Sequence, residues 1–186
     1  MDAVGFIHGR FQPLHNDHMK YLLAGKSRCR HMVVGITNPD PLLTSHDPDD
    51  PVRSLDSANV LTYYQRLNMI RDALLEAQVS YEEFSIVPFP VNRPDLYRFY
   101  APLDATFYLT IYDSWGHKKH KLFQSVGLKT EVMWEKPATE KGICGATVRN
   151  AMVHGDPWEH LVPASTARLL KEWRMPEMLA AWNRGA

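Results

Sequence analysis

Between an apolar run and an amphipathic segment, the chain reads Gly9-Arg10-Phe11-Gln12-Pro13-Leu14-His15-Asn16-Asp17-His18. The preceding residues 3–7 are apolar enough to form a buried strand, and Gly9 permits a tight turn after it. His15 and His18 then stand three residues apart at the start of a predicted helix, where exposed N–H groups and the helix dipole attract anions. This stretch predicts a phosphate-binding site directly after the first strand.

The composition is that of an ordinary globular protein, with 45% hydrophobic and 23% charged residues among 186. Lys+Arg and Asp+Glu both number 21, so no overall charge attracts nucleic acid, and any anion binding must be local. We expect one domain over residues 1–186, with a helical C-terminal part from about residue 146. The composition leaves the oligomeric state open, a homo-oligomer included.

Two further features bear on the compartment. No apolar run approaches the length needed to span a membrane, and the N-terminus lacks a basic-then-apolar signal. The two cysteines, Cys29 and Cys144, make no disulfide framework and fit a reducing environment. We therefore expect a cytoplasmic protein with neither a membrane nor a nucleic acid as partner.

Strand and helix patterns alternate along the chain. Strands are predicted at residues 3–8, 31–37, 84–87, 105–111 and 130–134, and helices at 17–29, 61–78, 115–126, 147–154, 165–173 and 176–183. One face of the second helix is expected to carry Tyr64, Leu67, Ile70 and Leu74. This alternation predicts an α/β fold: a Rossmann-like, doubly wound, parallel five-stranded sheet with C-terminal helices. Ligands of such folds bind at the carboxyl ends of strands, where the two histidines stand.

Two irregular stretches interrupt the pattern. Residues 38–59 are polar and rich in proline, and they follow the second strand, so we expect them to form a lid over the site. Residues 88–102 form the second irregular stretch. The basic segment 117–121 is interpreted as a solvated helix face, with phosphate binding as the alternative. Trp134 is expected in the core, and Cys144 as a buried thiol without chemical reactivity.

Two separated motifs resemble those of one enzyme family. Residues 9–18 are similar to the signature of the HxGH nucleotidylyltransferases, and residues 143–149 (Ile-Cys-Gly-Ala-Thr-Val-Arg) resemble that family's C-terminal motif. The resemblance is closest to the archaeal-type nicotinamide-nucleotide adenylyltransferases and runs from residue 4 to about residue 172. The chain departs from the family pattern at three positions: Asp17 replaces glycine, Cys144 replaces serine and Ala146 replaces threonine.

The resemblance implies that an acceptor phosphate attacks the α-phosphorus of a nucleoside triphosphate in line and that pyrophosphate leaves. His15 and His18 would be the catalytic donors to the α- and β-phosphates, and Arg149 would hold the β- and γ-phosphates. The residues implied to bind the nucleotide phosphates are Gly9, Arg10, Phe11, Gln12, Ile143, Cys144, Gly145 and Thr147. Mg²⁺ would accompany ATP or another triphosphate without a protein cage, and Asp17 is the one carboxylate considered as a ligand.

The substrates are expected to be small molecules, a nucleoside triphosphate and a phosphorylated acceptor. The reading we favour from the sequence is transfer from ATP to nicotinamide or nicotinate mononucleotide. The alternative is a cytidylyltransferase that acts on another small phosphate or phosphonate, and a third option is a nucleotide-binding module without catalysis. The candidate acceptor-binding residues are Asn38, Asn92, Arg93, Asp113 and Trp115.

The paired histidines also allow a structural interpretation. Two histidines three residues apart could cap a core or form half of a zinc site. A zinc site needs a third ligand, and no cysteine or histidine cluster supplies one by its spacing. The glycine-containing prefix before the histidines favours the phosphate-binding interpretation.

Overall fold

The structure is a computed structural model, and it describes residues 1–44 and 55–185. Its strands are β1 (Asp2–Gly9), β2 (Cys29–Thr37), β3 (Phe84–Phe89), β4 (Thr106–Ile111) and β5 (Thr130–Glu135). Its α-helices are α1 (Asn16–Lys26), α2 (Tyr63–Glu76), α3 (Ser114–Ser125), α4 (Gly145–His154), α5 (Ala164–Glu172) and α6 (Met175–Gly185). Short 3₁₀ turns are η1 (Pro41–Leu43), η3 (Asp56–Ala58), η4 (Tyr81–Glu83), η5 (Pro94–Phe99), η6 (Ala138–Glu140) and η7 (Glu159–Leu161).

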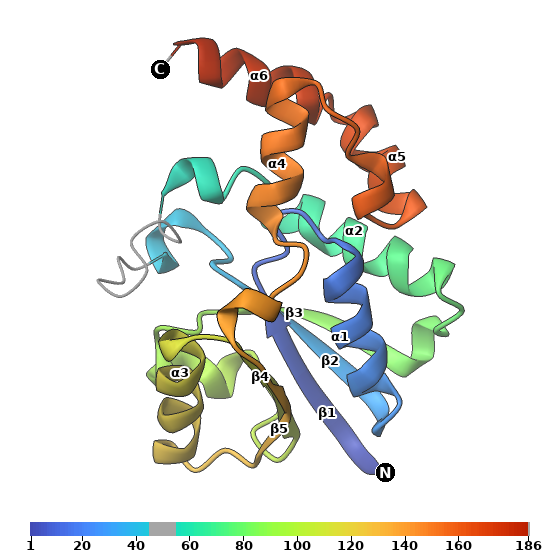
Figure 1. The fold of residues 1–186 in the computed structure, drawn as a ribbon. Helices are drawn as coiled ribbons and strands as arrows, with labels where there is room; N and C mark the ends of the chain where they lie inside the picture. Colours follow the sequence, from blue (N-terminus) through green and yellow to red (C-terminus); the bar gives the residue numbers. More distant parts are fainter. Residues whose placement is uncertain (45–54, 186) are drawn as a thin grey trace.

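The five strands form one parallel sheet in the order β3-β2-β1-β4-β5, which confirms the predicted fold class (Figure 1). The central strand β1 pairs with β2 on one side and with β4 on the other. The strand order therefore reverses at β1. In open parallel sheets, a crevice opens at the carboxyl ends of the strands beside such a reversal.

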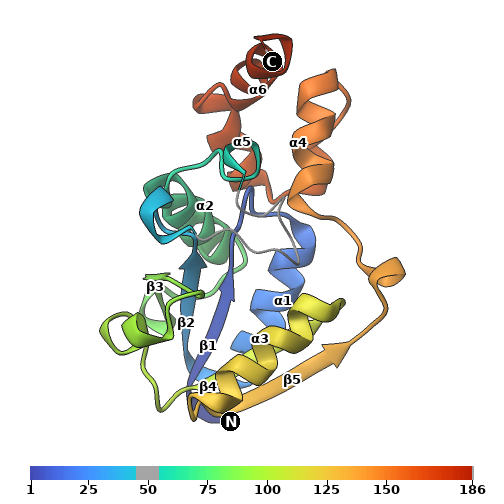
Figure 2. The ribbon, with the colours of Figure 1, turned by 90° about the vertical axis from the view of Figure 1, so that its left-hand side faces the viewer.

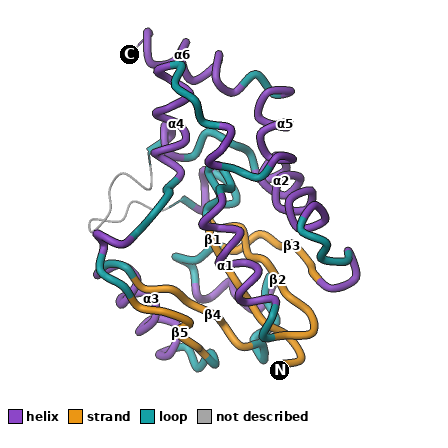
Figure 3. Tube along the Cα trace, turned by 45° about the vertical axis from the view of Figure 1, so that its right-hand side comes forward, coloured by secondary structure: helices purple, strands orange, loops and turns teal. Residues whose placement is uncertain are grey.

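Helices cover both faces of the sheet. The helices α1 and α2 pack on one face, where they share a hydrophobic cluster with β1 and β2. Helix α3 packs against β4 and β5, and its Phe123 joins a second cluster with Phe6, Phe89 and Phe107 (Figure 2). The helices α4, α5 and α6 gather beyond the carboxyl ends of the strands (Figure 3). This arrangement encloses the crevice between the sheet and the C-terminal helices.

Local capping explains where the first two helices begin. His15 is the N-cap of α1, and its Nδ1 atom accepts a hydrogen bond from the His18 N–H at 3.3 Å. Thr62 and Gln65 form a reciprocal capping box at the start of α2. Because His15 of the phosphate motif is also the cap of α1, the start of this helix fixes the position of the His15 ring.

Three expectations require correction. Strand β3 extends through Pro88 to Phe89, because β3 lies at the sheet edge and its pairing with β2 does not require every outward N–H. The stretch 88–102 is not wholly irregular, since η5 occupies Pro94–Phe99. Tyr64 is 72% exposed, because the helix turn places it about 90° from the direction shared by the other three residues of the predicted face.

The lid predicted for residues 38–59 has its central part, residues 45–54, outside the described residues. The flanking segments carry the short turns η1 and η3. Among residues 1–44 and 55–185, no helix combines the length and the apolar character that crossing a membrane requires.

Candidate functional site

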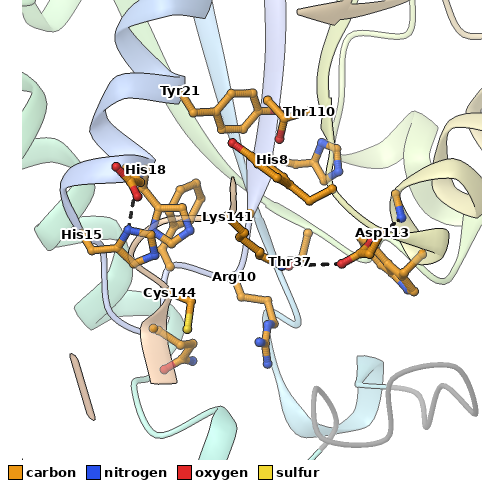
Figure 4. A pocket seen from close by; sticks show the side chains of 18 of the residues that line it. His8, Arg10, His15, His18, Tyr21, Thr37, Thr110, Asp113, Lys141 and Cys144 are labelled. Atoms are coloured by element: carbon orange, nitrogen blue, oxygen red, sulfur yellow. Dashed lines mark hydrogen bonds and ion pairs between the residues drawn. The ribbon is translucent and has the colours of Figure 1, made fainter. Parts of the chain in front are cut away.

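A pocket opens at the carboxyl ends of the strands, where the strand order reverses (Figure 4). It is lined by fourteen of the sixteen residues predicted to bind nucleotide, react or hold the acceptor: Gly9, Arg10, Phe11, Gln12, His15, His18, Asn38, Asn92, Asp113, Trp115, Ile143, Cys144, Gly145 and Arg149. Arg93 and Thr147 do not line it. Arg93 is turned to Asp95 in an ion pair at 2.7 Å, and Thr147 contacts the Cys144 thiol at 3.2 Å.

Two walls of the pocket can be distinguished by the face of the sheet to which they belong. We call the side built by α1 and the loop before α4 the α1 wall; it carries His15, His18 and Ile143. The α3 wall lies on the other face and carries His8 and Lys119. Figure 4 shows His15 and His18 on the opposite side of the pocket from His8.

The histidine pair of the α1 wall is stacked. The ring centroids of His15 and His18 are 3.6 Å apart with an interplanar angle of 22°, and the ring of Phe11 meets His18 edge-on at 4.9 Å. Because Nδ1 of His15 accepts the helix-capping hydrogen bond, the proton of a neutral His15 ring is on Nε2. The cap therefore sets the tautomer, and Nε2 is the nitrogen that can donate to a ligand.

Both rings are neutral at neutral pH. Burial lowers the pKa of His15 to about 4, against a smaller opposite effect of the Asp17 charge. Burial also holds the pKa of His18 well below its ordinary value, and the charges of His15, Arg10 and Lys141 act in the same direction. The pair is thus a set of N–H donors, and a bound phosphate would favour protonation of the rings.

Two side chains of the glycine turn, those of Phe11 and Gln12, make contacts within the protein. Phe11 has φ of 53° and is fully buried beneath His18. The Gln12 side chain pairs with the backbone of Leu61, accepting from its N–H at 2.8 Å and donating to its carbonyl at 2.9 Å. The side chains of Phe11 and Gln12 thus hold the turn in place. Both residues line the pocket, and their contact with nucleotide phosphates stays a prediction.

The second motif packs directly on the first. Arg149 donates from Nη1 to the carbonyl oxygen of Gln12. Gly145, the first residue of α4, has no room for a side chain, because an added Cβ would lie 2.4 Å from that same carbonyl oxygen. The N-terminus of α4 lies at the pocket beside the α1 wall, and the positive end of a helix suits an anion there.

Cys144, the N-cap residue of α4, is half-buried and lines the pocket. Burial raises the pKa of its thiol, but hydrogen bonds from Thr147 and from the backbone of Ala146 lower it overall. The expectation of a buried thiol is therefore wrong, because the helix N-terminus presents the sulfur to the ligand space.

Asp17, which replaces the family glycine, joins the two motifs. Its Oδ2 atom accepts a hydrogen bond from the Ile143 N–H at 2.6 Å, and its Oδ1 atom pairs with Lys20. A Cβ added to Gly142 would lie 2.2 Å from that Oδ2 atom. Both carboxylate oxygens thus have protein partners, so Asp17 tethers the α4 loop and is not proposed as a metal ligand.

For the nucleotide substrate that the two motifs imply, we expect Asp17→Ala to raise the KM about tenfold, because the loop before α4 loses the tether that sets its position. Steady-state kinetics with varied nucleotide concentration measures this effect. Lys20→Ala is the matched control, since it removes the exposed ion pair and keeps the Ile143 hydrogen bond; its KM should stay within about twofold. An Asp17→Ala variant with a lower KM would instead show that the carboxylate repels the nucleotide.

The α3 wall and the ends of β4 and β5 supply further polar groups. Asp113 caps α3 by accepting from the Gly116 N–H at 2.9 Å, and Lys141 lies 3.5 Å from its Oδ2 atom. Lys119 lies 4.5 Å from the centroid of the Trp115 ring. The basic segment 117–121 is therefore not only a solvated face, because its central lysine lines the pocket.

Trp134 packs against the main hydrophobic cluster but is not itself fully buried, so the expectation of a core position is correct only in part. It is half-buried at the end of β5, lines the pocket and donates from Nε1 to the Tyr112 hydroxyl at 2.8 Å. Its ring meets Tyr21 edge-on at 6.1 Å. The strand position alone could not separate a core tryptophan from one at the pocket rim.

A buried arginine holds the pocket loops together. Arg66 is 1% exposed, and it donates hydrogen bonds to carbonyl oxygens at the start of α2, at the last residue of β2 and in the loops after β1 and β2. Its acceptors are Thr62 O at 3.3 Å, Arg10 O at 3.0 Å, Thr37 O at 2.7 Å and Asn38 O at 2.7 Å. Burial and the nearby Arg10 lower its pKa to about 10, so it remains cationic at neutral pH.

The charge of the pocket favours an anionic ligand. Among the residues that the structure describes, the lining contains the cations Arg10, Lys119, Lys141 and Arg149. Its carboxylates are Asp17 and Asp113, both engaged by protein N–H groups. The chain as a whole is neutral, so this positive balance is a local property of the site, as the composition required.

The sequence patterns did not point to several polar residues that line the pocket: His8, Tyr21, Thr37, Thr110, Tyr112 and Lys141. Two signals could have found some of them. Thr37 and Thr110 stand at or near the carboxyl ends of their strands, and His8 is a polar residue inside an apolar run. Lys141 had no such signal, because its position depends on the path of the loop after β5.

No cage for a metal ion is formed by the described part of the chain: it contains no group of three or more His, Cys, Asp or Glu side chains that could hold one.

Comparison with known proteins identifies full-length relatives, although no family model matches the chain. Phosphonoformate cytidylyltransferase from Streptomyces viridochromogenes is 50% identical over 179 residues, which cover 96% of this chain and 96% of that protein. Nicotinamide-nucleotide adenylyltransferase from Thermococcus kodakarensis is 29% identical over 170 residues, which cover 90% of this chain and 82% of that protein.

Among solved structures, a bifunctional NMN adenylyltransferase/ADP ribose pyrophosphatase from Francisella tularensis matches 99% of this chain with a TM-score of 0.66 and 15% sequence identity. The match covers 53% of that chain, so the present chain spans about half of its length. At this level of identity, the likeness concerns the fold.

Proposed function

Because the chain belongs to the HxGH nucleotidylyltransferase superfamily and is a nucleotidylyltransferase, we propose that it transfers a cytidylyl group from CTP to a small phosphonate. The observation that carries this proposal is the 50% identity over nearly the whole chain to phosphonoformate cytidylyltransferase. The adenylyltransferase relative is far less similar, at 29% identity. The proposal therefore replaces the expectation of ATP and nicotinamide mononucleotide with the alternative drawn from the sequence.

The site residues support a transfer without a protein nucleophile. One oxygen of the phosphonate attacks the α-phosphorus, a new P–O–P bond forms, and the bond to the β-phosphate breaks as pyrophosphate leaves. Nε2 of His15 and the ring of His18 donate to the phosphate oxygens as negative charge develops there. Arg149 and the N-terminus of α4 hold the leaving phosphates.

A divalent cation fits this scheme as a companion of the triphosphate. Bound there, Mg²⁺ would neutralise charge on the phosphate oxygens. The protein's own contribution is positional: the stacked histidines, the α4 N-terminus and the buried Arg66 keep the donors fixed before the substrate arrives.

The proposal is tested by measuring pyrophosphate release with CTP or ATP, each combined with phosphonoformate or nicotinamide mononucleotide. We expect the pair of CTP and phosphonoformate to exceed every other pair at least about tenfold in kcat/KM, with the mixed anhydride of CMP and phosphonoformate as the product in mass spectrometry. Faster reaction of ATP with the mononucleotide would overturn it. If the protein binds a nucleotide but releases no pyrophosphate with any pair of nucleotide and acceptor, a nucleotide-binding module without catalysis would be favoured.

A further inference from the structure

The α3 wall contains a histidine that the two motifs do not explain. His8 stands in β1 directly before the glycine turn, and its side chain shares a face of the sheet with Phe6. Its ring centroid lies 5.7 Å from that of Phe89 and 5.2 Å from that of Phe123, both in edge-on contacts. The imidazole therefore sits in an aromatic cluster where a central strand would ordinarily place an apolar side chain.

Both ring nitrogens of His8 are buried, and neither has a hydrogen-bond partner among residues 1–44 and 55–185. The residue is only 5% exposed, and it is one of the residues that line the pocket. Buried polar groups are nearly always paired, so an unpaired imidazole at a ligand pocket calls for an explanation. Since aromatic rings pack around the imidazole, the pocket is the direction from which a partner can reach it (Figure 4).

The surroundings define what such a partner would be. The charge of Lys119 acts on His8, and burial together with that charge holds the pKa of His8 well below its ordinary value. The ring is therefore neutral and carries one N–H donor. Lys119 and Asn92 line the same pocket, so the group that fits here is a small anionic oxygen acceptor.

In the proposed reaction, each wall of the pocket contacts a different substrate. The histidine pair, the α4 N-terminus and Arg149 belong to the first two motifs, and they serve the triphosphate in the proposed reaction. A phosphonate that attacks the α-phosphorus from the opposite side must then lie toward the α3 wall. In that arrangement, the end of the acceptor that does not react would be the end nearer to His8.

We propose that His8 donates a hydrogen bond to the second anionic group of the acceptor, the carboxylate of a phosphonoformate-like molecule, and so selects acceptors that carry one. This inference rests on the proposed transfer to a phosphonate. It makes His8 a specificity-determining residue for the acceptor, with no role in binding the nucleotide.

The test compares two acceptors in the presence of CTP: phosphonoformate, which has the carboxylate, and methylphosphonate, which lacks it. In His8→Leu, the KM for phosphonoformate should rise about 10- to 100-fold, the range expected when a hydrogen bond to a charged group is lost. The KM for CTP and the KM for methylphosphonate (or its inhibition constant, where it is not turned over) should stay within about threefold. His8→Gln, which keeps a donor, should recover part of the loss.

Phe123→Leu is the matched control, because it changes the packing around His8 without removing a polar group. It should leave the preference for phosphonoformate within about threefold of the wild type. An equal loss for both acceptors in the folded His8→Leu protein, or a loss confined to CTP, would overturn the assignment. The proposed function is tested separately, by measuring whether the wild-type protein uses phosphonoformate. If the wild-type protein does not use it, both the proposed function and the assignment of His8 are wrong.

Discussion

The replacement His18→Ala is expected to lower kcat about 100- to 1,000-fold, the usual loss when one preorganised donor to a developing negative charge is removed. The ring of His18 does not cap the helix, since the cap uses the ring of His15 and only the backbone N–H of His18. Its ring Nδ1 is buried without a partner in the described part of the chain. The variant therefore loses a catalytic donor and keeps the start of α1.

Single-turnover kinetics with saturating CTP and acceptor measures the chemical step, and nucleotide affinity is measured separately by calorimetry. The affinity should change by less than about tenfold, since Arg149 and the α4 N-terminus remain. His154→Ala serves as the control, because His154 is exposed and hydrogen-bonds to the Asn150 carbonyl within its own helix. A kcat of His18→Ala within about threefold of the wild type would remove the histidine pair from the proposed mechanism.

The second large effect concerns stability. Arg66→Ala is expected to lower the free energy of unfolding by about 3 to 5 kcal/mol, because it leaves several carbonyl oxygens without their donor and opens a cavity. Those oxygens belong to the start of α2, to the last residue of β2 and to the loops after β1 and β2. Arg66→Lys should recover only part of the loss, since one ammonium group cannot reproduce the planar fork of the guanidinium.

Urea denaturation measures both variants against Arg71→Ala. Arg71 lies on the same helix but pairs with Asp72 at the surface, so its removal should cost no more than about 1 kcal/mol. Equal losses for Arg66→Ala and Arg71→Ala would contradict the role of Arg66 as the tie between the pocket loops. In the proposed reaction, the loosened loops should also raise the KM of any folded Arg66 variant.

The fold was largely predictable from local pattern. The apolar run before Gly9 is β1, and the alternation that follows it along the chain is the parallel sheet with its helices. Two predictions were wrong, the end of β3 and the buried face of α2. Pro88 is tolerated in β3 because β3 is an edge strand, and the rotation about the axis of α2 points Tyr64 away from the core. Neither fact is local to the residue concerned.

The sequence by itself determined the two motifs, their order and a phosphate-binding site, because a glycine turn, a helix N-terminus and paired histidines act within a few residues of one another. The reaction class followed from the resemblance of the two motifs to one enzyme family. Only the tertiary structure decided how these parts meet. Gln12 pairs with Leu61 49 positions away, Arg66 reaches Arg10 across 56, and Asp17 holds Ile143 across 126. Such contacts leave no periodic pattern in the chain, because they form only when the sheet brings the ends of its strands to one edge. For the same reason, the unpartnered imidazole of His8 could be recognised only after the aromatic side chains around it had been placed.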